Sequence, residues 1–250
     1  MVINRPLLKK NARIIIRCAR PSVIGAAVIF ILVSAVLSTL SGSVLGVNIS
    51  PDEAQRYMNY YLSGNYEAIL RMSADMIPPS SAYFINALIS IVQYVFGAGF
   101  VIFLFNTVKR AGAVYGNLLD GFSLALKLIG LAFLQGILVF LWSLLLVIPG
   151  IIASYRYRMA YYLLLENPEL GVVESMRRSR QMMHGHKWEC FVLDLSFIGW
   201  RLLAALPYVG YAVMLWSTPY METTYVLYYM SLAGNPVVVV DGPDDPSYPV

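Results

Sequence analysis

Residues 124–166 read LALKLIGLAFLQGILVFLWSLLLVIPGIIASYRYRMAYYLLLE, an apolar run that is interrupted midway by Pro149-Gly150. Lipid offers no hydrogen-bond partner to free backbone groups, so a chain crosses a bilayer either as helices or as a closed barrel. The apolar residues here are continuous and do not alternate with polar ones, which favours helices. The stretch therefore predicts two transmembrane helices, at 124–148 and 150–166, joined by a tight turn at the Pro-Gly pair.

The composition of the whole chain agrees with this interpretation. Of its 250 residues, 58% are hydrophobic and only 13% are charged, and the mean hydropathy is +0.65. A soluble domain averages about 25% charged residues. So few charges cannot cover the surface of a water-soluble globule of 27.9 kDa. The sequence predicts an all-α fold, a polytopic transmembrane helical bundle of about six spans with amphipathic cytoplasmic helices.

The predicted organisation has three parts. A basic amphipathic juxtamembrane helix covers 1–20, a transmembrane domain covers 21–232, and an acidic tail, expected to be disordered, covers 233–250. The first apolar run is longer than the roughly 7–15 residues of a signal-peptide core, which favours an uncleaved span. The six predicted spans lie at about 22–46, 83–107, 124–148, 150–166, 189–208 and 211–232.

Charge distribution sets the predicted topology. Basic residues concentrate on the cytoplasmic side of membrane proteins. If 150–166 returns to the cytoplasm, the basic segments 5–20, 109–127 and 177–187 all lie inside, and only Arg56 and Arg71 lie outside. If it does not return, the basic segment 177–187 falls outside. The hairpin is therefore preferred, and both termini are expected in the cytoplasm.

Two segments have the basic, amphipathic pattern of helices that rest on a membrane surface. One covers 4–20 with Asn4 as its cap, and the other covers 167–187 with Asn167 as its cap and Pro168 in its first turn. Such helices bind anionic lipid headgroups. A nucleic-acid partner is disfavoured, because the first span follows the N-terminal basic segment at once.

No motif indicates enzyme chemistry. The chain contains no GxxxxGK[ST], GxSxG or HExxH sequence, so we expect no enzyme, cofactor or metal. His184 and His186 flank Gly185 without a third metal ligand and are interpreted as a solvated turn. Cys18 and Cys190 form no CxxC pair and are expected to be ordinary reduced thiols.

Five charged residues fall inside predicted spans, where each costs roughly 2.5–3.5 kcal/mol even on a lenient insertion scale. A helix rises by about 1.5 Å per residue, which places the shallowest of the arginines about 10 Å from the outer turns. The same count places the two acids about 20 Å from those turns. An arginine side chain can bridge that gap. The predicted cluster either holds the bundle together or lines a polar cavity for an anion, a lipid headgroup or a proton. Its members are Arg156, Arg158, Asp194, Arg201 and Glu222.

A further set of residues between 149 and 231 suggests a family. These are a Pro-Gly pair, an MxGxK motif, an SFIGW run and a Pro-Tyr pair, together with Tyr155 and Tyr157. The motif positions are Pro149, Gly150, Gly185, Lys187, Ser196, Phe197, Gly199, Trp200, Pro219 and Tyr220. In these residues the chain resembles the bacterial integral-membrane family called domain of unknown function 975. It is more distantly similar to the membrane domain of glycerophosphodiester phosphodiesterases, whose catalytic domain has no counterpart here.

The resemblance implies a protein of the bacterial cytoplasmic membrane and implies no known activity. We therefore expect a non-enzymatic accessory or interaction subunit, which contacts the lipid bilayer and either a membrane-protein partner or a second copy. The alternative is a small transporter, or a lipid- or anion-handling protein with a charged intramembrane cavity. The scarcity of broken helices and the lack of an internal repeat place that alternative second.

Overall fold

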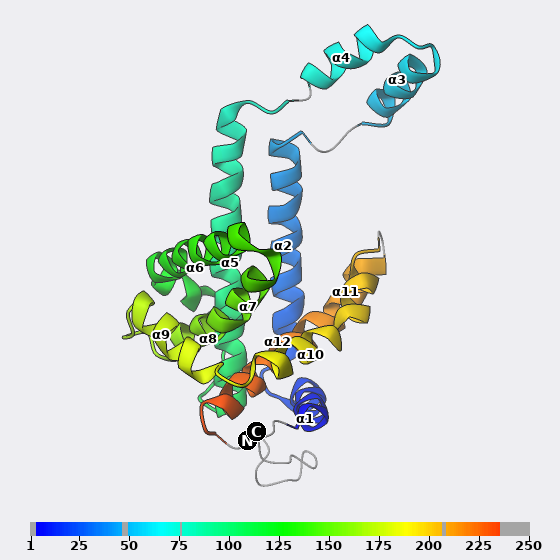
Figure 1. The fold of residues 1–250 in the computed structure, drawn as a ribbon. Helices are drawn as coiled ribbons and strands as arrows, with labels where there is room; N and C mark the ends of the chain where they lie inside the picture. The colour runs from blue at the N-terminus through cyan, green and yellow to red at the C-terminus, as the bar shows by residue number, and fades with distance from the viewer. Residues whose placement is uncertain (1–3, 47–49, 76, 207–208, 236–250) are drawn as a thin grey trace. The chain divides into compact units, whose positions relative to one another are not determined.

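The computed structural model describes residues 4–46, 50–75, 77–206 and 209–235, and every regular element in those ranges is a helix (Figure 1). This confirms the predicted all-α fold. The chain divides into two compact units, one of residues 1–31 with 95–250 and the other of residues 32–94. Of the predicted acidic tail, 236–250 lies outside the described residues.

Three helical stretches are long and apolar enough to cross a membrane. They are α2 (Val23–Val44), α5 (Ser80–Lys109) and the stretch Tyr115–Leu145. The last begins as a 3-10 helix, η1 (Tyr115–Leu124), and continues as α6 (Ala125–Leu145). These three stretches contain most of the first three predicted spans. Long uninterrupted apolar runs favour single helices because every backbone group is then paired within the segment.

The other three predicted spans have shorter or interrupted helices. Residues 150–166 fall on α7 (Val147–Tyr157) and α8 (Met159–Glu166). Residues 189–208 fall on α10 (Lys187–Leu195) and α11 (Ile198–Ala204), with 207–208 outside the described part. Residues 211–232 lie within α12 (Val209–Leu232), which contains Pro219. The count of six spans stays a prediction.

The chain reverses direction between α6 and α7 at a different residue from the one predicted. Leu146, with extended φ −162° and ψ 148°, separates the two helices, while Pro149 and Gly150 belong to the start of α7. Proline suits the first turn of a helix because its missing N–H has no partner there. Gly150 is needed for packing, because a Cβ at this position would lie 2.0 Å from the Ser143 Oγ on α6.

The far ends of the same two segments also meet. The Lys127 ammonium, near the start of α6, donates a hydrogen bond to the carbonyl oxygen of Pro168, just after α8. Together with the Gly150–Ser143 contact, this makes α6 antiparallel to α7 and α8, as the predicted hairpin requires.

The N-terminal amphipathic helix is α1 (Arg5–Cys18). Its first turn is capped by the Asn4 side chain, whose Oδ1 accepts a hydrogen bond of 3.2 Å from the Leu7 N–H. The apolar face buries Leu8, Ala12 and Ile15, and α1 packs against α12. The cap and the face both follow the predicted pattern.

The second amphipathic helix, α9 (Val172–Met182), begins later than predicted. Asn167 does not cap it. Instead the Asn167 N–H donates to the Leu163 carbonyl at 3.0 Å and ends α8, and its own carbonyl accepts the Leu170 N–H. The Asn-Pro pair therefore lies in a turn. After the helix, Gly185 has a φ of +85°, which a glycine adopts without strain.

A polar layer joins the ends of three helices in the larger unit. Lys109 at the end of α5 forms an ion pair with Glu166 at the end of α8, and the Tyr229 hydroxyl on α12 donates to the same carboxylate. The rings of Phe105 and Tyr162 pack against Tyr229, with centroids 5.6 and 5.8 Å away. Spans two, four and six are predicted to end on the cytoplasmic side at this layer.

The smaller unit contains the rest of α2, the start of α5 and two short helices between them. The Ser41 hydroxyl on α2 donates to the Asn86 side chain on α5. The short helices are α3 (Pro51–Leu62) and α4 (Tyr66–Asp75), and the turn between them uses Gly64 at a φ of +68°. No described residue of α3 is buried, so this helix leaves its tyrosines on the surface.

Candidate functional site

The carboxylate of Asp194 is the centre of a polar cluster in the larger unit. Asp194 lies in the last turn of α10, and its side chain is only 12% exposed. It forms an ion pair with Arg158, at the junction of α7 and α8, and accepts hydrogen bonds from the hydroxyls of Tyr155 (2.8 Å) and Tyr225. The carboxylate therefore has three close donors from two segments, the end of α7 and α12.

Arg201 on α11 joins the cluster from the other side. Its Nη2 atom lies 3.8 Å from the Asp194 carboxylate and donates to the Tyr225 hydroxyl at 3.1 Å. The Tyr225 hydroxyl thus connects Arg201 to Asp194. The Tyr225 ring also faces the Arg158 guanidinium, 4.6 Å from its centroid, which is a cation–π distance.

Glu222 on α12 lies beside this group and does not form an ion pair in it. Its carboxylate accepts a hydrogen bond of 3.5 Å from the Tyr162 hydroxyl, and it lies within electrostatic range of Arg158 and Arg201. Two arginines thus stand beside two carboxyl groups. A buried charge needs a partner of opposite sign, because a protein interior solvates it poorly.

Arg156 is the predicted member that the structure does not bring to Asp194. Its guanidinium lies over the ring of Tyr157, 5.7 Å from the centroid, and its backbone carbonyl accepts the Ser179 hydroxyl at 3.0 Å. Side chains two residues apart on a helix point in directions about 200° apart. Arg158 and Arg156 therefore cannot both face α10.

Sequence reasoning missed the part that tyrosines play in this cluster. Tyr155 is a motif position, but nothing in its surroundings indicated a carboxylate partner. Tyr225 carried no signal beyond its place in an aromatic run. Tyrosine hydroxyls find a partner when they are buried, so tyrosines at the same predicted depth as an acid in a predicted span are a usable signal.

Several motif positions meet at a break between helices. Residues 196–197 separate α10 from α11, and Pro219 lies inside α12. The buried ring of Phe197 packs edge-on against Tyr220, with centroids 5.5 Å apart, and against Tyr225 at 5.8 Å. The break in one predicted span thus lies beside the proline of the next. Gly199 and Trp200 follow on α11, and Lys187 begins α10.

Within the described residues, no group of three or more His, Cys, Asp or Glu side chains is placed to hold a metal ion. The His186 ring pairs with Glu189 at 2.9 Å, and its carbonyl accepts the Tyr228 hydroxyl. His184 is exposed. Cys18 and Cys190 are free thiols, and Cys190 is buried.

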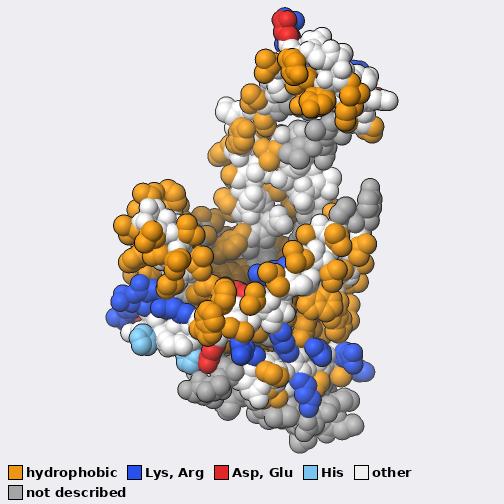
Figure 2. All heavy atoms as spheres, turned by 45° about the vertical axis from the view of Figure 1, so that its right-hand side comes forward, with side chains coloured by type: hydrophobic (Ala, Val, Ile, Leu, Met, Phe, Trp, Pro, Cys, Tyr) orange, Lys and Arg blue, Asp and Glu red, His pale blue; other side chains and the backbone are white. Residues whose placement is uncertain are grey.

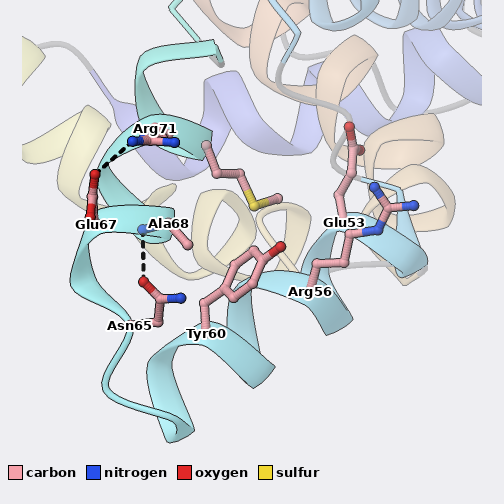
Figure 3. A pocket seen from close by; sticks show the side chains of 8 residues that line it. Glu53, Arg56, Tyr60, Asn65, Glu67, Ala68 and Arg71 are labelled. Atoms are coloured by element: carbon pink, nitrogen blue, oxygen red, sulfur yellow. Dashed lines mark hydrogen bonds and ion pairs between the residues drawn. The ribbon is translucent and has the colours of Figure 1, made fainter.

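A second polar site lies in the smaller unit, between α3 and α4 (Figure 3). Its hollow, of about 550 Å³, is lined by Glu53, Arg56 and Tyr60 on α3 and by Glu67 and Arg71 on α4, which pair at 2.6 Å. Both signs of charge are present, and the four charged side chains are exposed while Tyr60 is partly buried. Such a surface has little preference for an anion or a cation.

The surface of the larger unit has separate basic and hydrophobic areas. Figure 2 shows basic side chains gathered over α1 and α9 and a wide hydrophobic area over the neighbouring helices. Exposed apolar side chains are numerous on α6 and also occur on α11. They include Leu126, Phe133, Phe140 and Leu144 on α6 and Ile198, Leu202 and Leu203 on α11.

Comparison with models of protein families matches nearly the whole chain, residues 3–236, to a family whose function is unknown. No curated protein and no solved structure matches the chain.

Proposed function

The chain belongs to that family, which is described as protein of unknown function (DUF975). From this premise we propose that it is a non-enzymatic multi-pass protein of the bacterial cytoplasmic membrane. In this proposal it acts as an accessory or interaction subunit. Three helices of sufficient length and apolarity support a membrane location. The proposal includes six spans and cytoplasmic termini.

One observation supports an interaction role best. The Asp194 carboxylate is satisfied from within the protein, by Arg158, Tyr155 and Tyr225. A cluster whose charges are already compensated does not require a ligand. The surfaces that remain available for binding other molecules are the exposed apolar faces of α6 and α11 and the basic faces of α1 and α9.

The test is site-specific photo-crosslinking in living cells. A photoreactive phenylalanine derivative replaces Phe140 on α6 or Leu202 on α11, which are 64% and 65% exposed, and the matched control replaces Leu128, which is buried on α6. We expect a discrete protein adduct from an exposed position and none from Leu128. Two differently tagged copies of the chain distinguish a second copy from another protein. Adducts with lipid alone at both exposed positions would contradict the proposal.

A second candidate function is favoured by one feature of the cluster. The Arg201 side chain is 50% exposed, so an anion could reach it. If the protein moves or holds an anion, proteoliposomes should show an anion flux that Arg201→Gln abolishes. Under the interaction proposal, proteoliposomes of the parent protein show no flux above that of empty vesicles.

A further inference from the structure

An exposed apolar stripe runs along one face of α3. Its large side chains recur three and four residues apart, the spacing that places them on the same side of a helix. They are Tyr57, Met58, Tyr61 and Leu62, which are 43%, 55%, 62% and 75% exposed. A row of large apolar side chains on a surface marks a place where another apolar phase or molecule makes contact.

The neighbouring helix α4 does not cover this stripe. The face that α3 turns to α4 is polar, since Glu53, Arg56 and Tyr60 line the hollow that the two helices share (Figure 3). Successive residues of a helix point about 100° apart, so the centre of this polar face points roughly 135° away from the centre of the stripe. The apolar side of α3 is therefore directed away from α4.

Membrane lipid is the partner that α3 can reach. Residues 45–50 connect α2 to α3, and residues 76–79 connect α4 to α5. An extended residue spans at most about 3.6 Å, so α3 starts within about 25 Å of the end of α2, and α4 ends within about 18 Å of the start of α5. Both α2 and α5 can cross a membrane, and the Ser41–Asn86 hydrogen bond holds these two ends side by side. The connections thus keep α3 close to the point where both helices would leave the bilayer.

The size and composition of α3 suit the surface of a bilayer. Its 12 residues extend about 18 Å, which is too short to cross a hydrocarbon layer of about 30 Å. Two of the four stripe residues are tyrosines, which are enriched where membrane meets water because the ring is buried while the hydroxyl stays hydrated. A helix with this pattern lies in the plane of the interface, with its apolar face among the headgroups and the first acyl carbons.

Charge does not explain such a contact. Within α3 the sequence has two acidic residues, Asp52 and Glu53, and one basic residue, Arg56. Anionic lipid attracts basic segments, so it has no preference for this helix. The contact depends on apolar area, and salt should not weaken it.

The N-terminal helix α1 provides a contrast. It is also amphipathic, but the side chains of Leu8, Ala12 and Ile15 are only 2%, 0% and 3% exposed, and α1 packs against α12. Its apolar face is occupied by the protein and cannot enter lipid at the same time. Of these two helices, α3 is the one that presents its apolar face to the surroundings.

We propose that α3 is an interfacial helix, which inserts Tyr57, Met58, Tyr61 and Leu62 into the headgroup region of the leaflet at which α2 ends. This inference rests on the membrane location in the proposed function. It goes beyond that function because it assigns lipid as the partner of one defined face. The headgroup layer is hydrated, so water-soluble thiol reagents still reach this face.

Site-directed spin labelling of the full chain in phosphatidylcholine vesicles tests the proposal. In a background with Cys18→Ser and Cys190→Ala, labels are attached at Ala54→Cys and Met58→Cys on the apolar side, and at Asn59→Cys as the matched control. All three positions are exposed, and Asn59 lies next to Met58 on the opposite side of the helix. The measured quantity is the ratio of collisions with oxygen, which concentrates in lipid, to collisions with a nickel chelate, which stays in water. We expect this ratio to be several-fold higher at the two apolar positions than at Asn59→Cys, at low and at high salt.

Each other outcome overturns the proposal. Equal and frequent nickel collisions at all three positions would show that α3 lies in water. Few collisions with either reagent at Ala54→Cys and Met58→Cys would show that protein covers the stripe. An oxygen preference at Asn59→Cys as large as at Met58→Cys would show that lipid surrounds the helix. A preference that requires phosphatidylglycerol and disappears at high salt would show that charge, and not the apolar face, holds α3 at the surface.

Two further measurements keep the result unambiguous. Monodispersity and thermal unfolding show whether each labelled variant folds, and if Met58→Cys does not, Ala54→Cys tests the same face. Resistance of the parent protein to alkaline carbonate extraction from membranes tests the location separately. An extractable protein contradicts the proposed function, whereas a resistant protein with its α3 stripe in water contradicts only the interfacial helix.

Discussion

Arg158 forms an ion pair with Asp194, a residue 36 positions later in the chain, and so ties the junction of α7 and α8 to the end of α10. Both side chains are largely buried, with 23% and 12% of their surface exposed. Between these two segments the chain forms α9, so the pair closes a loop through a helix with a basic surface. Separating the partners would leave a buried charge without compensation.

Removing one partner of this pair should therefore cost more than removing both. We expect Asp194→Leu to destabilise the protein by about 3 kcal/mol, the low end for a buried pair because some exposure remains. Adding Arg158→Leu should restore part of that loss, whereas adding Arg156→Leu, the matched control, should not. Thermal unfolding in detergent, in a double-mutant cycle, measures the coupling. Equal rescue by both arginine changes would show that the assigned pair is wrong.

The Tyr225 hydroxyl should contribute measurably, because it connects Arg201 to Asp194. Tyr225→Phe keeps the ring against Arg158 and removes only the hydrogen bonds, so we expect a loss of about 1–2 kcal/mol. Tyr211→Phe is the control, since Tyr211 lies on the same helix and is 60% exposed. The unfolding temperature of both variants is compared with that of the parent. A loss at Tyr211 as large as that at Tyr225 would contradict the assigned bridge.

The parts of the fold that depend on long apolar runs could be predicted from the sequence. The first three predicted spans correspond to α2, α5 and the stretch Tyr115–Leu145, because the length of an apolar run directly limits how it can cross lipid. The cap at Asn4 was also predictable, since it is a short-range pattern of side chain and backbone.

Features that depend on a choice between two local roles could not be predicted. Pro149 fits both a turn and the first turn of a helix, and the structure uses the second. Asn167 fits both a cap and a helix end, and again the structure uses the second. The choice between Arg156 and Arg158 depends on which face of α7 and α8 meets α10, which is tertiary information.

Close contact between α5 and the 3-10 helix η1 should make Gly99 intolerant of a side chain. A Cβ on Gly99 would lie 1.9 Å from the carbonyl oxygen of Leu118. We expect Gly99→Ala to destabilise the protein by about 1–3 kcal/mol, the cost of overpacking. Gly136→Ala, on α6 with nothing within 4 Å of its Cβ, should be neutral or stabilising by up to about 1 kcal/mol. The unfolding temperatures of the two variants, compared with that of the parent, test this packing. A destabilised Gly136→Ala with an unaffected Gly99→Ala would contradict it.

The basic segments 5–20 and 167–187 should bind anionic lipid as isolated peptides. Each Lys or Arg near an anionic surface contributes about 1 kcal/mol, and salt screens that attraction. Vesicles containing phosphatidylglycerol should therefore bind both peptides at low salt and release them at high salt. For the 167–187 peptide, extended to Trp188, tryptophan fluorescence measures this binding. Equal binding to vesicles of phosphatidylcholine alone would contradict an electrostatic surface.

The six-span topology makes a prediction for each loop. After Cys18 and Cys190 are replaced by serine and alanine, single cysteines at Tyr61, Val114, Arg180 and Asp245 report the side of the membrane. Tyr61, Val114 and Arg180 are exposed, and Asp245 lies outside the described residues. A thiol reagent that cannot cross the membrane should label intact cells at Tyr61→Cys alone, and permeabilised cells at all four positions. The charge distribution requires this result, because the basic groups around 109–127 and 177–187 belong on the cytoplasmic side. External labelling of Arg180→Cys would show that 150–166 does not return to the cytoplasm, despite the antiparallel contact between α6 and the segment that follows it.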